Sequence, residues 1–144
     1  MAVKPVPEGY RTATPYLIVK DAAKLLDFVK SAFSAKVNEE HRMPDGRVAH
    51  ADVMIGDSHV MMGQASERWP ESTGSILLYV PNADRSYESA LKAGAKSVQK
   101  VEHQFYGDRL GGVVDPCGVT WWISTHVEDV PHDELERRMR AVVH

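Results

Sequence analysis

The chain has 144 residues and a formal net charge of −3, and its Lys and Arg residues form no basic stripe of the kind that binds nucleic acid. No apolar run approaches the roughly 20 residues of a membrane-spanning helix, and the N-terminal segment lacks the apolar core of a signal peptide. The lone Cys117 excludes an internal disulfide. We therefore expect a cytoplasmic protein whose partner is neither nucleic acid nor a membrane.

The first half of the chain predicts an arm followed by a βαβββ unit. Pro5 and Pro7 indicate that residues 1–13 form an extended arm. A strand follows, then a helix that has Asp21 as its N-cap residue and an apolar stripe at helical spacing, and then three strands. The expected ranges of these five elements are 14–19, 22–33, 36–43, 47–55 and 58–63.

The second half predicts the same order of elements. Residues 64–74 contain Pro70 and Gly74 and are expected to form a linker, after which Asn82 caps the second long helix. The expected strand, helix and three strands are 75–80, 83–93, 96–104, 108–114 and 119–125. Beyond them, residues 126–144 carry a terminal helix with an apolar stripe, which would pack on the domain or on a second chain.

The two units are an internal repeat. A shift of 61 residues lays residues 51–62 onto 112–123, turn on turn and strand on strand. The same shift lays residues 17–22 onto 78–83, with no gap between the two matches. The sequence therefore predicts two similar modules in an α+β fold.

Several short stretches carry a more specific pattern. They are Arg42-Met43-Pro44-Asp45-Gly46-Arg47-Val48, Tyr106-Gly107-Asp108-Arg109, Asp115-Pro116-Cys117-Gly118, Trp121 and Thr125-His126-Val127-Glu128-Asp129-Val130. Together with the tandem repeat over residues 14–125, they resemble the vicinal oxygen chelate superfamily, which includes glyoxalase I, bleomycin resistance proteins and extradiol dioxygenases, and within it the PhnB-like branch. The resemblance implies one glyoxalase-like domain, in which βαβββ modules at 14–63 and 75–125 form a curved mixed sheet around a cavity.

The resemblance also implies where a metal would bind. In the metal enzymes of this superfamily, one ligand lies on the first and one on the fourth strand of each half. Here these positions fall on Thr14, Met61, Ser75 and Trp122. None of the four offers the imidazole nitrogen or carboxylate oxygen that a divalent ion prefers. We therefore expect the superfamily's metal site to be lost and no cofactor to be bound.

Strand alternation predicts which side chains share a face with these four positions. On the third strand, the residues assigned to the cavity are Val48, His50, Asp52 and Met54. Trp121 and Trp122, as neighbours, must point to opposite faces. We assign Trp121 to the helix side and Trp122 to the cavity. Shifting the third strand by 61 residues predicts four inward positions on the seventh strand, which are Arg109, Gly111, Val113 and Asp115.

These assignments give candidate site residues. His50 with Asp52 would act as an acid–base pair, and the expected ligand-binding residues are Tyr16, His59, Met61, Tyr79, Arg109 and Trp122. The alternatives are a structural role for His50 and a salt bridge from Arg109 to Asp108, Asp52 or Glu102. A divalent metal held by His50, Asp52 and His59 is a further alternative.

The leading hypothesis is a PhnB-like protein of the glyoxalase and bleomycin-resistance type, a homodimer that binds a small organic ligand in its sheet-lined cavity without the superfamily metal. The alternative is a glyoxalase-like lyase, isomerase or dioxygenase, with a relocated divalent metal or with metal-free acid–base catalysis. A third class is an interaction module that works through its terminal helix. The sequence leaves open whether the chain is an enzyme, and whether its modules pair within one chain or across two.

Overall fold

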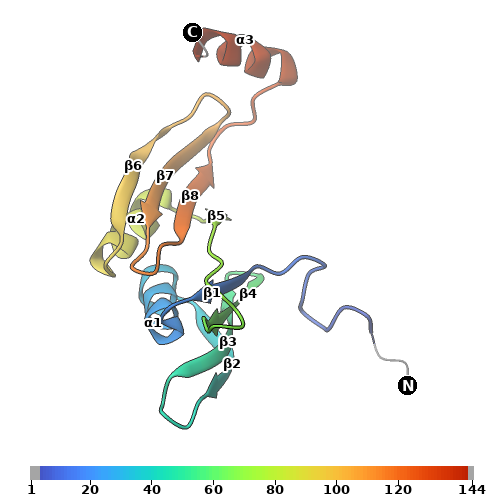
Figure 1. Ribbon diagram of the computed structural model, residues 1–144. Coiled ribbons are helices and arrows are strands. Elements are labelled where there is room, and N and C mark those ends of the chain that lie inside the picture. The colour runs from blue at the N-terminus through green and yellow to red at the C-terminus, as the bar shows by residue number, and fades with distance from the viewer. Residues whose placement is uncertain (1–3, 143–144) are drawn as a thin grey trace.

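The chain folds into two similar modules followed by a terminal helix (Figure 1). A computed structural model describes residues 4–142; the ends of the predicted arm and terminal helix, at 1–3 and 143–144, lie outside the described residues. The first module contains β1 (Tyr16–Val19), α1 (Ala22–Phe33), β2 (Lys36–Arg42), β3 (Val48–Ile55) and β4 (Ser58–Gln64). The second contains β5 (Ser75–Tyr79), α2 (Ala83–Lys92), β6 (Lys96–His103), β7 (Asp108–Val114) and β8 (Thr120–His126), and α3 (His132–Val142) follows it.

Each module builds one mixed sheet of four strands. The strand orders are β1-β4-β3-β2 and β5-β8-β7-β6, so the same topology occurs twice. In each sheet the first strand is parallel to the fourth, and the other neighbours are antiparallel. This arrangement confirms the predicted α+β fold with tandem βαβββ modules and a C-terminal helix.

Side-chain caps fix where both long helices begin. The Asp21 carboxylate accepts a hydrogen bond from the Lys24 backbone N–H at 3.1 Å, and the Asn82 side chain accepts one from the Arg85 N–H at 3.1 Å. Each bond satisfies one of the backbone donors that the first helical turn leaves free. Both caps were predicted from the sequence.

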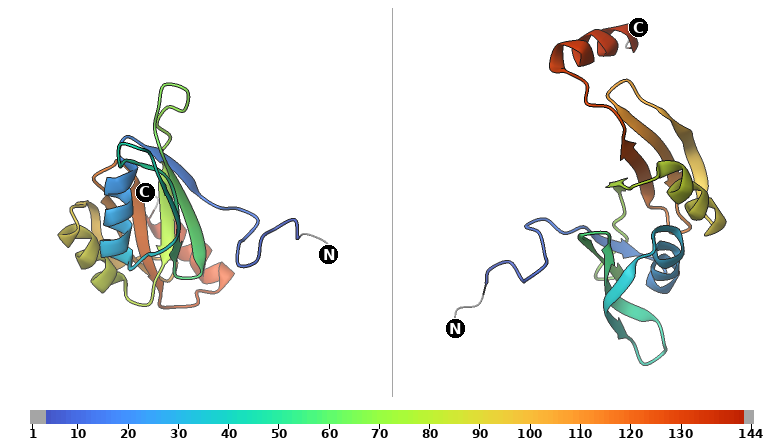
Figure 2. Two further views of the ribbon diagram at one scale, coloured as in Figure 1. Left: turned by 90° about the horizontal axis from the view of Figure 1, so that it is seen from below. Right: turned by 180° about the vertical axis from the view of Figure 1, so that it is seen from behind.

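Helices α1 and α2 pack on each other and cover one face of each sheet, so the molecule has a helical layer and a sheet layer (Figure 2). The core between the layers is continuous across the modules. Trp121 of β8 is fully buried, and its ring centroid lies 5.0 Å from that of Phe33 in α1. This position confirms that Trp121 points to the helix side. Within residues 4–142, no helix is long and apolar enough to cross a membrane.

By strand pairing, the loop of the β7–β8 hairpin in the second module is one residue longer than the loop of the β3–β4 hairpin in the first. Asp52 lies opposite Met61 in the first sheet, whereas Gly112, rather than Val113, lies opposite Trp122 in the second. Because a one-residue offset moves every side chain to the other face of the strand, the inward assignment on the seventh strand is wrong. Pairing with β8 instead places Arg109, Gly111 and Val113 on the helix side. Asp115 lies on the same side, because its carboxylate accepts a hydrogen bond from the buried Trp121.

A second irregularity changes the face of the sheet to which the first side chain of β3 points. His41 pairs with His50 and Arg42 with Val48, so Ala49 is an extra residue in the ladder. A bulge of this kind shifts the alternation by one position. Val48, which was assigned inward with His50, is therefore fully buried in the core instead.

Candidate ligand-binding site

The two sheets share an open face, defined as the face that α1 and α2 do not cover. Strand pairing places on it eight residues of the first sheet, which are Tyr16, Ile18, His50, Asp52, Met54, His59, Met61 and Gly63. From the second sheet come Ser75, Leu77, Tyr79, Asp108, Leu110, Gly112, Val114, Thr120, Trp122, Ser124 and His126. The open face thus contains every predicted strand site residue except Arg109.

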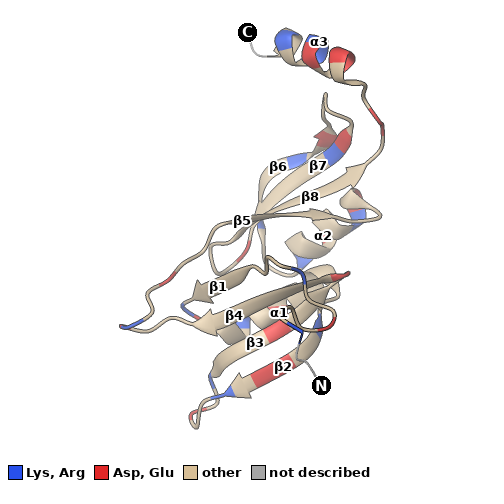
Figure 3. Cartoon of the chain, turned by 90° about the vertical axis from the view of Figure 1, so that its right-hand side faces the viewer, with Lys and Arg blue, Asp and Glu red and all other residues tan. Residues whose placement is uncertain are grey.

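Small residues let two aromatic rings lie flat against the open face. A Cβ added to Gly63 would lie 3.2 Å from the Tyr16 hydroxyl, and one added to Gly112 would lie 2.5 Å from the Trp122 ring. At each glycine, the absence of a Cβ therefore lets an aromatic side chain pack directly on the backbone. Charged residues are absent from four of the strands that form this face: β1, β4, β5 and β8 contain no Lys, Arg, Asp or Glu (Figure 3).

A buried carboxylate lies at the centre of the first sheet. Asp52 is fully buried, and one of its oxygens lies 2.9 Å from Nδ1 of His59. The other oxygen accepts hydrogen bonds from the Tyr10 hydroxyl and from Asn38 Nδ2, the latter at 3.0 Å. Burial alone would raise the pKa of Asp52, but the hydrogen bonds from Tyr10, His59 and Asn38 outweigh it and hold that pKa below its ordinary value.

His50 does not join this cluster. Its ring lies 5.6 Å from that of Tyr16 and 6.1 Å from that of His41, centroid to centroid. The structure therefore pairs Asp52 with His59 rather than with His50. Among residues 4–142, no three His, Cys, Asp or Glu side chains converge as a metal site would require, so His50, Asp52 and His59 are not brought together as a ligand set.

The residues at the superfamily's metal positions do not fit a divalent ion. Thr14 and Met61 line a recess under the N-terminal arm, and Trp122 covers Gly112 with its ring. A hydroxyl, a thioether and an indole are poor ligands for the borderline and hard ions of this superfamily. We derive no chemistry through a metal at these positions.

A second buried carboxylate lies on the second sheet. Asp108 accepts hydrogen bonds from the Tyr79 hydroxyl at 2.8 Å and from Ser124 Oγ at 3.1 Å, and its other oxygen lies 2.8 Å from His126 Nδ1. Burial opposes ionisation, but the bonds from His126, Tyr79 and Ser124 hold the pKa of Asp108 below its ordinary value. His126 also reaches Asp129, with Nε2 at 2.7 Å from its carboxylate.

His126 is expected to titrate above the ordinary pKa of 6.5, because the carboxylates of Asp129 and Asp108 favour its protonated form. A raised folded-state pKa means that the stabilisation is present below the unfolded-state pKa and is lost as pH rises through the folded one. An NMR titration of the imidazole Cε1–H resonance measures this pKa. Asp129→Asn should lower it and the exposed Asp133→Asn should not; a wild-type pKa below 6.5 would contradict the prediction.

Arg109 lies outside the candidate site. It points to the helix side and forms a two-pronged ion pair with Asp84 of α2, at 2.7 and 2.9 Å. The predicted inward position of Arg109 among the ligand-binding residues is therefore wrong, and its partner is none of the three carboxylates considered. The cause is the one-residue difference in hairpin length.

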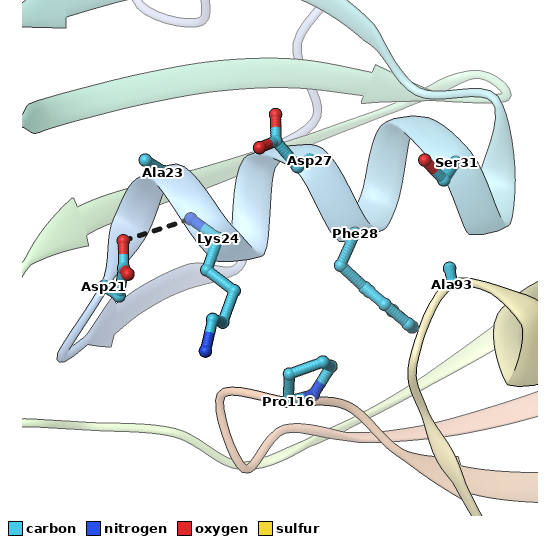
Figure 4. Close-up of a pocket in the computed structure, with 8 residues that line it drawn as sticks. All are labelled: Asp21, Ala23, Lys24, Asp27, Phe28, Ser31, Ala93 and Pro116. Atoms are coloured by element: carbon cyan, nitrogen blue, oxygen red, sulfur yellow. Dashed lines mark hydrogen bonds between the residues drawn. The ribbon is translucent and has the colours of Figure 1, made fainter.

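Besides the recess under the arm, three further recesses lie on different sides of the molecule. One, of about 380 Å³, opens on the first sheet between Tyr16 and Trp69. A second, of about 730 Å³, lies between the β3–β4 turn and β5, and its lining includes Leu77 and Tyr79 of the open face. A third, of about 550 Å³, lies in the helical layer between α1 and the turn at Pro116 (Figure 4). In Figure 4 the Asp21 carboxylate is engaged as the α1 cap and Asp27 points away from Pro116. We therefore place the candidate site on the open face.

Sequence reasoning identified Asp52, His59 and Tyr79 but missed the other five residues that make up the two carboxylate clusters. The unpredicted members are Tyr10, Asn38, Asp108, Ser124 and His126. Asp108 and His126 belong to the stretches that resemble the PhnB-like branch, which was a usable indication. Tyr10 could not be found by strand alternation, because it lies in an arm outside the strands.

Sequence comparisons agree with this fold. The sequence model of the Glyoxalase/Bleomycin resistance protein/Dioxygenase superfamily matches residues 11–123. An uncharacterized protein of Mycobacterium bovis is 36% identical over 139 residues, which cover 89% of this chain and 91% of the relative. An uncharacterized protein of Mycobacterium tuberculosis strain H37Rv is also 36% identical over 139 residues, which cover 89% of this chain and 82% of that relative.

Solved structures share the same architecture. TioX from Micromonospora sp. ML1 has a TM-score of 0.71 at 21% identity, over 81% of this chain and 99% of that chain. A gene product from Arabidopsis thaliana has a TM-score of 0.64 at 24% identity, over 80% and 98% of the two chains. A superfamily member from Sphaerobacter thermophilus has a TM-score of 0.65 at 20% identity, over 80% and 96%. At these identities the likeness concerns the fold alone.

Proposed function

Since the chain belongs to the glyoxalase/bleomycin resistance protein/dioxygenase superfamily, we propose that it is a PhnB-like cytoplasmic protein that binds a small organic ligand on its open face, as a homodimer. The observation that carries the proposal is the composition of that face. It combines aromatic and apolar side chains with two buried carboxylates, Asp52 and Asp108, whose partners fix their orientation. Ligand sites commonly have this mixture of apolar walls and a few placed polar groups.

The exposure of the open face supports a dimer. Tyr16 is 49%, Leu77 45% and Tyr79 66% exposed, although all three lie on the same face of the sheet layer. Large apolar side chains that remain exposed on one face indicate an interaction surface. Strand β5 also lies at a sheet edge, where backbone groups are available to another strand, whereas Ile18 at the edge of β1 is already paired with Ser72. A second copy would cover the open face and turn it into an enclosed pocket.

We expect the wild-type protein to sediment with twice the chain mass of 16.0 kDa, and Leu77→Glu to shift it towards the monomer. A carboxylate at position 77 would have to be buried without a partner in the dimer, which costs several kcal/mol. Sedimentation equilibrium measures the mass. Lys92→Glu at the end of α2 is the control and should leave the mass unchanged. A monomeric wild-type protein would rule out the dimer.

Metal-free acid–base catalysis is the second candidate, because each buried carboxylate on the open face holds an imidazole. A carboxylate that orients a neutral histidine is the usual arrangement of a general base. His59 has such a partner in Asp52, whereas the predicted base His50 does not. On this reading the chain would exchange a proton of its ligand, which can be followed as deuterium uptake from D₂O.

Metal analysis distinguishes metal-free ligand binding and metal-free acid–base catalysis from a metal-dependent enzyme. Because the four superfamily positions lack suitable donors, we expect less than one equivalent of bound metal after the untagged protein is soaked in zinc, nickel, iron or manganese. Binding of small aromatic probes, followed by saturation-transfer NMR, should survive a chelator. Stoichiometric metal, or binding that is lost on chelation, would overturn the metal-free proposal.

A further inference from the structure

The N-terminal arm places one aromatic ring of the chain itself on the open face. We propose that Tyr10 is a self-ligand that occupies a binding site for phenols, in which the ligand's hydroxyl donates to Asp52 and its ring stacks on His59. The inference rests on the proposed function, because it names the class of ligand for the first sheet of the open face.

The contacts of Tyr10 describe a complete site for a phenol. Its ring is stacked on the His59 imidazole, with centroids 3.6 Å apart and an angle of 13° between the planes. Its hydroxyl donates to Asp52 Oδ2 and accepts from Asn38 Nδ2 at 3.3 Å. Both hydrogen-bonding functions of a phenol are thus satisfied, and its ring has a planar partner.

The protein residues of this site are held in place without Tyr10. His59 Nδ1 lies 2.9 Å from Asp52 Oδ1, and Asn38 donates to Asp52 Oδ2 at 3.0 Å. Asp52 and His59 come from neighbouring strands of one sheet and are both buried. If Tyr10 leaves, the Asp52 carboxylate loses one of its donors, and an external phenol would restore that bond.

The arm is held to the first module by few other contacts. Residues 4–12 form no helix or strand. The Lys4–Glu8 ion pair lies within the arm, and the Arg11–Asp57 pair, at 3.1 Å, joins two largely exposed side chains. An exposed ion pair contributes about 1 kcal/mol or less. Tyr10 is therefore the main anchor of a displaceable segment.

The space around Tyr10 admits ligands larger than its own ring. A recess of about 420 Å³ adjoins it, lined by the arm and by Thr14 and Met61 of the first module. A phenol that replaced Tyr10 would extend a substituent into this recess. The tethered ring has an effective concentration in the millimolar range, so the arm lowers the apparent affinity for external phenols without closing the site to them.

Trypsin cleavage after Arg11 in the full-length wild-type protein reports release of the arm. Saturating p-cresol should raise the cleavage rate several-fold, and 4-methylanisole, which has no hydroxyl hydrogen, should not. In full-length Tyr10→Ala, p-cresol should bind more tightly than in wild type by on the order of tenfold, as measured by NMR titration. Asp52→Asn in that background should remove the gain, whereas Asp45→Asn in the β2–β3 turn should keep it.

A larger probe distinguishes a true ligand site from a cavity that only the Tyr10→Ala substitution creates. Because 4-phenylphenol exceeds the volume of the deleted ring, its binding to Tyr10→Ala supports the site, and its exclusion shows that p-cresol only fills a void and overturns the inference. Equal effects of p-cresol and 4-methylanisole, or cleavage that p-cresol leaves unchanged, would also overturn it. Retained dimer mass and binding of other aromatic probes would show that the proposed function survives that failure.

Discussion

Trp121→Ala is expected to lower the free energy of unfolding by about 3–5 kcal/mol, the usual range for a buried tryptophan. Trp121 is fully buried, packs on Phe33 across the modules, and donates its indole N–H to Asp115 Oδ2 at 2.8 Å. The substitution would leave a cavity in the shared core and a buried carboxylate oxygen with one donor fewer. Urea unfolding followed by circular dichroism measures the change.

Two further variants test where this loss of stability comes from. Trp69→Ala removes an indole that is 61% exposed and should change stability by no more than about 0.5 kcal/mol. Trp121→Phe keeps an aromatic ring but deletes the donor to Asp115, so it should lose about 1–3 kcal/mol. A Trp121→Ala protein as stable as Trp69→Ala would show that the modules do not share this core.

Gly107→Ala should be the more destabilising of two matched glycine substitutions, with a loss of about 2–4 kcal/mol. Gly107 has φ +100°, and a Cβ there would lie 2.1 Å from the Glu128 carbonyl oxygen. The Gly107 carbonyl also accepts from the backbone N–H groups of Val127 and Glu128, at 2.9 and 3.0 Å. The substitution would push away the segment that leads to α3.

Gly118→Ala isolates the backbone contribution. Gly118 has φ +90°, but nothing lies within 4 Å of an added Cβ, so only the positive φ is penalised, at about 1–2 kcal/mol. Thermal unfolding of both variants gives the difference, which is the steric part at Gly107. Equal losses would mean that the contact with Glu128 is not maintained in solution.

The consequence for α3 can be followed separately. Arg138 of α3 forms a two-pronged ion pair with Glu128, at 3.0 Å for both bonds, and donates to the Phe105 carbonyl at 3.1 Å. The apolar side chains Met139 and Val142 remain exposed. The helix is therefore attached to the second module through polar contacts near Gly107, and Met139 and Val142 of the predicted apolar stripe do not pack on the domain.

The open face also explains why two module pairings were compatible with the sequence. The sequence predicts an apolar helix side, on which Trp121 lies, but not the module against which that side packs. Only the structure shows that the modules of this chain meet through α1 and α2, which leaves Tyr16 and Tyr79 exposed. Whether a second copy covers them is decided by the Leu77→Glu experiment.

Local patterns were enough to predict much of this protein. The 61-residue repeat predicted two βαβββ modules, Asp21 and Asn82 predicted helix starts, and the Trp121-Trp122 pair predicted one core and one open-face ring. These predictions hold because capping and alternation depend on residues that are near one another in the chain.

Only the tertiary structure decided the partners of the charged groups. One extra residue in the second hairpin turns Arg109 to Asp84 and Asp108 to the open face, and no local pattern fixes hairpin register. Likewise, Tyr10 and Asp52 are 42 residues apart and meet because the arm folds back over the sheet. The sequence by itself therefore determined the modules and their core, whereas long-range pairing determined the composition of the candidate site.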